Sequence, residues 1–129
     1  MCLIREKKNM SQNDGWPFIH RAESVASRPT ENLICWSIFE AIFSNRDISH
    51  HLIGFIPGRN GRVTSAIQQF CPKNRQITTK SGRLYNLLGM PGSSEDGLFV
   101  WQHWCTVNSV IYHKDVTDDY TKQIKNLVM

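Results

Sequence analysis

The segment RPTENLICWSIFEAIFSN, residues 28–45, holds the longest run rich in large apolar side chains in this chain. Thr30 is a suitable helix N-cap, Glu31 falls where the helix dipole favours an acidic side chain, and Asn45 can end a helix. Apolar side chains cover most of the helical circumference and leave only a narrow polar stripe that includes Ser37 and Glu40. The segment therefore predicts a helix over residues 31–45 that is buried on several sides. One face of this helix could also meet a second copy of the chain as a homodimer.

Residues 49–89 have the pattern of four short strands, expected at 49–57, 62–70, 75–80 and 83–89. Turn signals separate these segments, and in KSGR, residues 80–83, Gly82 supplies the positive φ that a tight hairpin turn at Ser81–Gly82 requires. The connections are too short for crossovers, so an antiparallel meander is predicted over residues 50–89.

The C-terminal third leaves one assignment open. Residues 98–107 fit a helix that begins near Ser93 or Ser94, because Trp101, Trp104 and Cys105 share one helical face. The same residues alternate as a strand would. Residues 109–116 predict a last strand, and Thr117 is expected to cap a C-terminal helix.

These elements predict an N-terminal arm over residues 1–28, where no clear periodicity is present, and a single α+β domain over residues 29–129. The domain is expected to pack a buried N-terminal helix on a curled antiparallel meander of about five strands, followed by a C-terminal helix. Closure into a small SH3-like barrel and an open curved sheet are the two alternatives for the strands.

The net charge of +4 is unevenly distributed. Residues 1–47 carry six basic and six acidic residues, residues 95–129 carry three basic and five acidic residues, and residues 48–94 carry six cations without a single Asp or Glu. Such a segment attracts anionic partners if its charges converge, whereas cations scattered over both sheet faces only keep a protein soluble. The predicted anion-binding residues are Arg59, Arg62, Lys73, Arg75, Lys80 and Arg83.

Catalytic and metal-binding signatures are absent from the sequence: it lacks GxSxG, HExxH, GxxxxGK[ST] and GxGxxG. Cys71 or Cys105 could pair with His103 or His113, but no orienting group is visible, and a structural zinc site needs four ligands. We therefore expect no enzyme, no catalytic residue, no metal and no cofactor.

The pattern favours a non-enzymatic binding or inhibitor module that docks through a basic antiparallel sheet on an acidic protein surface or a nucleic-acid-handling complex. Direct, weakly specific binding of DNA or RNA is the first alternative, with Phe55, Phe70 and Tyr85 as the few aromatic residues for base stacking. An enzyme with an unrecognised Cys/His site is the second.

No apolar run approaches the roughly 20 residues needed to cross a bilayer. The first ten residues, MCLIREKKNM, place their charges after the apolar residues, which is the reverse of a signal peptide, and the four cysteines lack framework spacing and predict reduced thiols. We expect a cytoplasmic protein that does not bind membranes.

Overall fold

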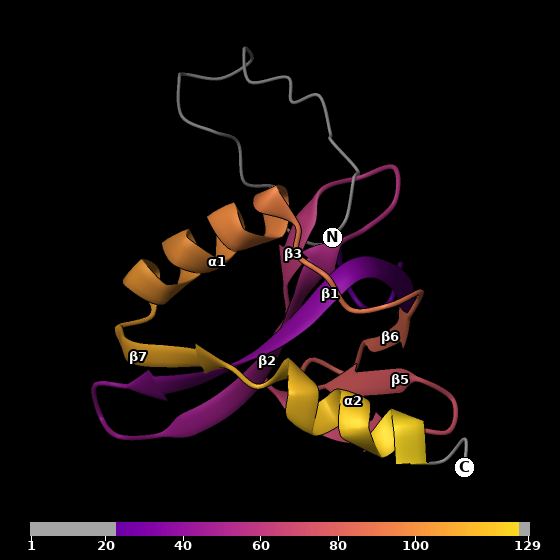
Figure 1. Ribbon diagram of the computed structural model, residues 1–129. Coiled ribbons are helices and arrows are strands. Elements are labelled where there is room, and N and C mark those ends of the chain that lie inside the picture. Colours follow the sequence, from indigo (N-terminus) through magenta and orange to yellow (C-terminus); the bar gives the residue numbers. More distant parts are fainter. Residues whose placement is uncertain (1–22, 127–129) are drawn as a thin grey trace.

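The computed structural model describes residues 23–126, so nearly all of the expected N-terminal arm lies outside the described residues. The described chain forms a mixed, mostly antiparallel sheet of seven strands, with two helices in its C-terminal half (Figure 1). The α+β class is confirmed.

The elements follow one another as seven strands and two helices, with α1 between the sixth and seventh strands. The strands lie in the order β3-β2-β1-β6-β5-β4, and β7 also pairs with β1. Their bounds are β1 Thr30–Phe43, β2 Ile48–Phe55, β3 Gly61–Val63, β4 Ile67–Cys71, β5 Gln76–Thr79, β6 Leu84–Leu87, α1 Glu95–Val107, β7 Val110–Asp115 and α2 Thr117–Asn126.

The predicted N-terminal helix is wrong, because the segment forms the long strand β1 at the centre of the sheet. Both faces of this strand are covered, so Cys35, Trp36, Ser37 and Ile38 are all buried although they alternate between the faces. A strand buried on both faces has the same continuous apolar sequence as a buried helix. Cys35 has a left-handed φ of 52°, and the pairing of β1 with β2 shifts register there.

Both edges of β1 are hydrogen-bonded over most of its length. On one edge, β2 pairs with it antiparallel from Ile34 to Ile42. The other edge is shared in turn by four partners: β6 runs parallel along residues 30–33, Gly92 N donates to Trp36 O (2.9 Å), Val116 N donates to Ile38 O (2.8 Å), and β7 runs antiparallel along residues 39–43. The C-terminal half of the chain therefore completes the central strand.

The curled meander and the SH3-like barrel are also wrong, since the sheet is open and ends in β3 on one side and β4 on the other. Residues 62–70 do not form one strand: β3 pairs with β2, and β4 pairs with β5. Closure would require the two ends of the sheet to meet, but β1 lies between β2 and β6 and holds the two groups of strands apart. The antiparallel pairing of β4, β5 and β6 agrees with the prediction, as does the turn at Gly82, whose φ is 96°.

The two helices cover opposite faces of the β1–β2 pair. Trp101 of α1 packs against Ala41 and Ile53, while α2 packs against the cluster that contains the alternate residues Ile38 and Leu52. Residues 98–107 are therefore helical, and the expected helix start at Ser94 is confirmed because its side chain accepts a hydrogen bond from Gly97 N at 3.0 Å. The predicted last strand and the C-terminal helix are confirmed as β7 and α2.

The contact between β3 and the start of α1 allows a test of this packing. An added Cβ at Gly61 would lie 2.5 Å from the Asp96 carbonyl carbon, whereas at Gly58 nothing lies within 4 Å and only the φ of 78° is strained. We expect Gly61→Ala to lower the free energy of unfolding by about 3 kcal/mol, because α1 must move away from the sheet. Gly58→Ala should cost only about 1 kcal/mol. Urea unfolding followed by tryptophan fluorescence measures both, and equal losses would contradict the close contact.

Candidate functional site

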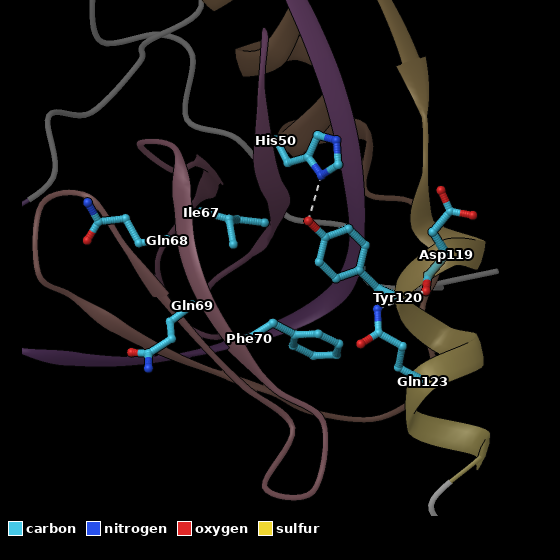
Figure 2. A pocket seen from close by; sticks show the side chains of 8 residues that line it. All are labelled: His50, Ile67, Gln68, Gln69, Phe70, Asp119, Tyr120 and Gln123. Atoms are coloured by element: carbon cyan, nitrogen blue, oxygen red, sulfur yellow. Dashed lines mark hydrogen bonds between the residues drawn. The ribbon is translucent and has the colours of Figure 1, made fainter.

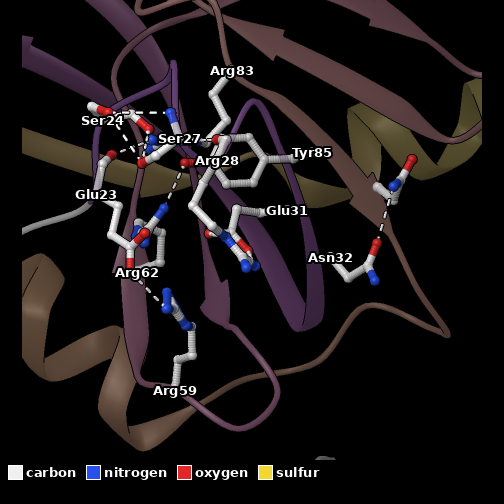
Figure 3. A network of polar contacts seen from close by, with 11 residues as sticks. Glu23, Ser24, Ser27, Arg28, Glu31, Asn32, Arg59, Arg62, Arg83 and Tyr85 are labelled. Carbon is white, nitrogen blue, oxygen red and sulfur yellow. Dashed lines mark hydrogen bonds and ion pairs between the residues drawn. The ribbon is translucent and has the colours of Figure 1, made fainter.

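Three of the six predicted cationic residues come together beside the turn that precedes β1 (Figure 3). Arg83 donates from Nε to the carbonyl oxygen of Arg28 at 2.8 Å and from Nη2 to that of Glu23. Arg59 forms an ion pair with the Glu23 carboxylate at 2.8 Å, and Arg62 donates to the Tyr85 hydroxyl at 3.0 Å. Arg62 and Arg83 are only 8% and 4% exposed. Arg83 therefore ties the turn to the sheet, whereas Arg62 joins β3 to β6.

A buried carboxylate lies next to these guanidinium groups. Glu31 is 3% exposed and accepts two hydrogen bonds from Arg28, at 2.7 and 3.1 Å. Burial opposes ionisation of Glu31, but the hydrogen bonds and charge of Arg28, with the charges of Arg62 and Arg59, outweigh it and lower its pKa. The carboxylates of Glu23, in the turn, and Glu31, in β1, thus balance part of the positive charge of residues 48–94.

The other three predicted residues lie around β5. Arg75 has a left-handed φ of 55° and donates to the carbonyl oxygens of Leu87, at 3.2 Å, and Gly89. Lys73 and Lys80 are exposed in the turns at the two ends of β5 and form no ion pair with another described residue. The six cations are therefore not one patch, and their role in anion binding stays a prediction.

A groove of about 390 Å³ lies between β4 and α2 (Figure 2). Figure 2 shows Ile67 and Phe70 of β4 pointing toward Tyr120, while Gln68 and Gln69 point away from α2. The groove is lined by His50, Ile67, Gln68, Gln69, Phe70, Asp119, Tyr120 and Gln123. The walls thus combine apolar side chains with the amide of Gln123, which can both donate and accept hydrogen bonds.

Tyr120 fixes the apolar floor of this groove. Its ring centre lies 5.1 Å from that of Phe70, and its hydroxyl is 2.6 Å from Nδ1 of His50. Nε2 of His50 in turn contacts the Glu40 carboxylate at 3.1 Å. Burial, with the charges of Asp119 and Glu40, raises the pKa of Tyr120, so the group is a neutral hydroxyl. Strand β2, strand β1 and helix α2 are joined through these three side chains.

Among residues 23–126, strand β4 is the terminal strand of the sheet and presents backbone groups that no other described strand pairs. Thr79 N donates to Arg83 O, so alternate residues of β5, beginning with Thr79, point toward β6. Gln76 and Thr78 consequently point toward β4, where they pair with Cys71 and Gln69. The peptide N–H and C=O of Phe70, between those two residues, face the free edge.

A second polar pair, at Ser49 and His51, is structural. His51 is 3% exposed and donates from Nδ1 to Thr64 O at 2.8 Å, so Nε2 accepts from Ser49 Oγ at 2.7 Å. Burial lowers the pKa of His51, against the hydrogen bond to Thr64, and the imidazole is neutral near pH 7. Its ring lies 4.5 Å from that of Trp104, within the cluster beneath α1.

The cysteines do not form an activated site. Burial raises the pKa of Cys105 to about 11, the opposite of what a nucleophilic thiolate requires, and Cys71 is an exposed free thiol. Cys35 is disulfide-bonded, so the expectation of reduced thiols is wrong there, and Cys2 lies outside the described residues. Residues 23–126 contain no group of three or more His, Cys, Asp or Glu side chains that could hold a metal ion.

No family model, no curated protein and no solved structure matches this chain. Within residues 23–126, neither helix has the length and apolar character needed to cross a membrane. Of the groove residues, only Phe70 was named from the sequence, as a candidate for base stacking. The others were not identified, because His50 and Tyr120 meet across 70 positions of chain.

The burial of Arg83 predicts that this residue stabilises the fold, and that its loss costs more stability than the loss of an exposed cation. Replacing Arg83 by Ala removes a charged donor from two backbone carbonyls and should lower the free energy of unfolding by about 3 kcal/mol. The matched change Lys80→Ala, at an exposed residue three positions away, should cost less than about 0.5 kcal/mol. Urea unfolding measures both values. Equal effects of the two substitutions would contradict the described contacts.

The environment of His51 predicts a pH dependence of stability. Its folded pKa lies below the value of about 6.5 in an unfolded chain, so the unfolded state binds more protons as the pH falls. The stabilisation is complete above about pH 6.5 and is lost as the pH drops through the folded pKa. His51→Gln should flatten this part of the curve of unfolding free energy against pH. An unaltered slope in His51→Gln would contradict the assignment.

Proposed function

We propose that this protein is a non-enzymatic binding module that takes up an extended, acidic segment of a partner protein along β4, in the groove between β4 and α2. The observation that carries the proposal is the combination of a free strand edge with an adjacent helix and a groove of about 390 Å³. Extended peptides bind such edges by adding a strand, with affinity from backbone hydrogen bonds and specificity from side-chain pockets.

Strand addition at β4 uses groups that the fold leaves unpaired. The backbone N–H and C=O of Phe70 face the edge, and each hydrogen bond they form with a peptide contributes about 1 kcal/mol. Alternate peptide side chains can then reach the apolar surface of Ile67 and Tyr120, while the amide of Gln123 remains at the rim. A peptide of four or five residues matches the length of β4.

The charge around β4 supports an acidic partner. Strands β4, β5 and β6 and the turns between them carry Lys73, Arg75, Lys80 and Arg83 without any Asp or Glu. On the opposite wall, Asp119 lies in the first turn of α2, where the helix dipole offsets its charge. An anionic segment bound along β4 would therefore be attracted by the exposed lysines at both ends of β5. It would be repelled only weakly by the carboxylate of Asp119.

The geometry gives less support to direct nucleic-acid binding. Two of the aromatic side chains considered for base stacking, Phe55 and Tyr85, are 3% and 2% exposed, and Phe70 packs against Tyr120. Single-strand binding requires exposed rings in a cationic groove. Of the sequence-based alternatives, the protein-binding module is the one for which the described residues provide a surface.

The proposal is tested with a synthetic peptide in which Glu and Val alternate, titrated into the isotope-labelled full chain. Chemical-shift changes are expected along β4 and α2, with a dissociation constant on the order of 100 μM, and the Phe70 amide should become slower to exchange. A Lys–Val peptide of the same length should bind at least tenfold more weakly.

Two variants and one control locate the site. Lys73→Glu should weaken binding of the Glu–Val peptide about fivefold through charge, and Gln123→Trp should abolish binding by filling the groove. Arg46→Glu reverses a charge in the exposed turn between β1 and β2, outside the groove lining, and should have no effect. Shift changes confined to other strands, or no binding at 1 mM peptide, would rule out the proposed groove.

A further inference from the structure

Strand β7 presents a second free edge, and its surroundings differ from those of β4. Among residues 23–126 it pairs only with β1, and every residue from Ile111 to Asp115 is exposed. The third edge, β3, spans three residues and is covered by α1, which approaches Gly61 closely. Long exposed edges that are not blocked are templates for pairing with another strand.

The backbone groups that face outward from β7 follow from its pairing. Val116 N donates to Ile38 O, so alternate residues counted back from Val116, namely Lys114 and Tyr112, direct their N–H and C=O toward β1. His113 and Asp115 therefore direct theirs to the free edge. Ile111 is the extra residue of β7 at the point where its pairing with β1 shifts register, between Ile42 and Phe43.

Exposed apolar side chains gather at the same edge. Six large apolar side chains among the described residues are notably exposed, and four of them lie on or beside β7: Ile111 at 60%, Tyr112 at 56%, Val107 at 65% and Ile48 at 60%. Ile48 belongs to this group because Ile42 lies opposite both Ile48 and Tyr112 in the sheet. Apolar exposure concentrated at one place marks an interaction surface.

We infer that two copies of this chain associate by pairing their β7 strands antiparallel, with His113 at the two-fold axis. In this register the two His113 residues exchange two backbone hydrogen bonds, and Ile111 of each copy lies opposite Asp115 of the other. Tyr112 lies opposite Lys114 of the second copy, in a pair without backbone hydrogen bonds where side chains are closest. The seven-stranded sheets then continue into one another.

Charge explains why a second copy suits this edge and does not suit β4. Each β7 carries one cation and one anion, Lys114 and Asp115, so two identical edges meet without net repulsion. Lys114 also meets the face of an aromatic ring, which attracts cations. Two β4 edges would instead bring Lys73, Arg75 and Lys80 of both copies together without a carboxylate from the strands.

Sedimentation velocity on the full chain at 5 to 200 μM tests the inference, with a concentration-dependent dimer expected in the micromolar range. His113→Pro removes an outward N–H and places a ring on the free edge, which an edge strand tolerates, and should weaken the dimer at least tenfold. Ile111→Lys should do the same by placing a charge in the contact. Met90→Lys makes the matching exchange at an apolar residue that is 74% exposed in the loop between β6 and α1, outside this group, and should leave the dimer intact.

Circular dichroism checks that each variant is folded. If His113→Pro does not fold, the effect of Ile111→Lys on the dimer is the deciding result. A wild-type chain that sediments as a monomer at 200 μM overturns the inference. So does a dimer that persists in folded His113→Pro or Ile111→Lys. The groove beside β4 takes no part in the β7–β7 contact, so a variant that loses the dimer should still bind the Glu–Val peptide. The two proposals can therefore be refuted independently.

Discussion

Backbone pairing along both edges of β1 is the constraint on which the rest of the structure depends. The strand is buried on both faces, and a buried peptide group without a hydrogen bond costs a large part of the marginal stability of a small domain. From Ile34 to Ile42, one edge is satisfied by the neighbouring strand β2. The other is satisfied only when β6, the backbone at Gly92 and Val116, and β7 align beside it. Cys35, with its left-handed backbone, marks the point where the strand passes from one set of partners to the other.

This central position of β1 determines which surfaces remain for function. Because it holds β2 and β3 on one side and β6, β5 and β4 on the other, the sheet cannot close, and its free edges fall at β4 and β7. The polar network at the start of β1 uses Arg62 and Arg83 for structure, which leaves the exposed lysines near β5 as the accessible positive charge. The edge beside α2 is polar and cationic, whereas the β7 edge is apolar and electrically balanced. We therefore assign them different partners.

The sequence predicted those elements whose signals are local. The hairpin at Gly82, the helix start at Ser94 and the last strand before α2 each depend on a few adjacent residues, and each is present. The segment over residues 31–45 was misassigned because an apolar run is compatible with a helix or with a strand covered on both faces, and only its distant partners decide between them. The contacts of the buried arginines could not be predicted for the same reason, because Arg83 donates to carbonyl groups 55 and 60 residues away in the sequence. The groove likewise depends on α2, which lies about 50 residues beyond β4.

Amide hydrogen exchange resolved by residue, combined with nuclear Overhauser contacts, tests the central position of β1 most directly. The account predicts that odd- and even-numbered amides of residues 37–42 exchange equally slowly, since the odd ones face β2 and the even ones face β7 and Thr117. It also predicts an Hα–Hα contact between Ile38 and Leu52 across the strands. Strong sequential amide–amide contacts through residues 31–43, as in a helix, would contradict the account. So would even-numbered amides that exchange as fast as those of a loop.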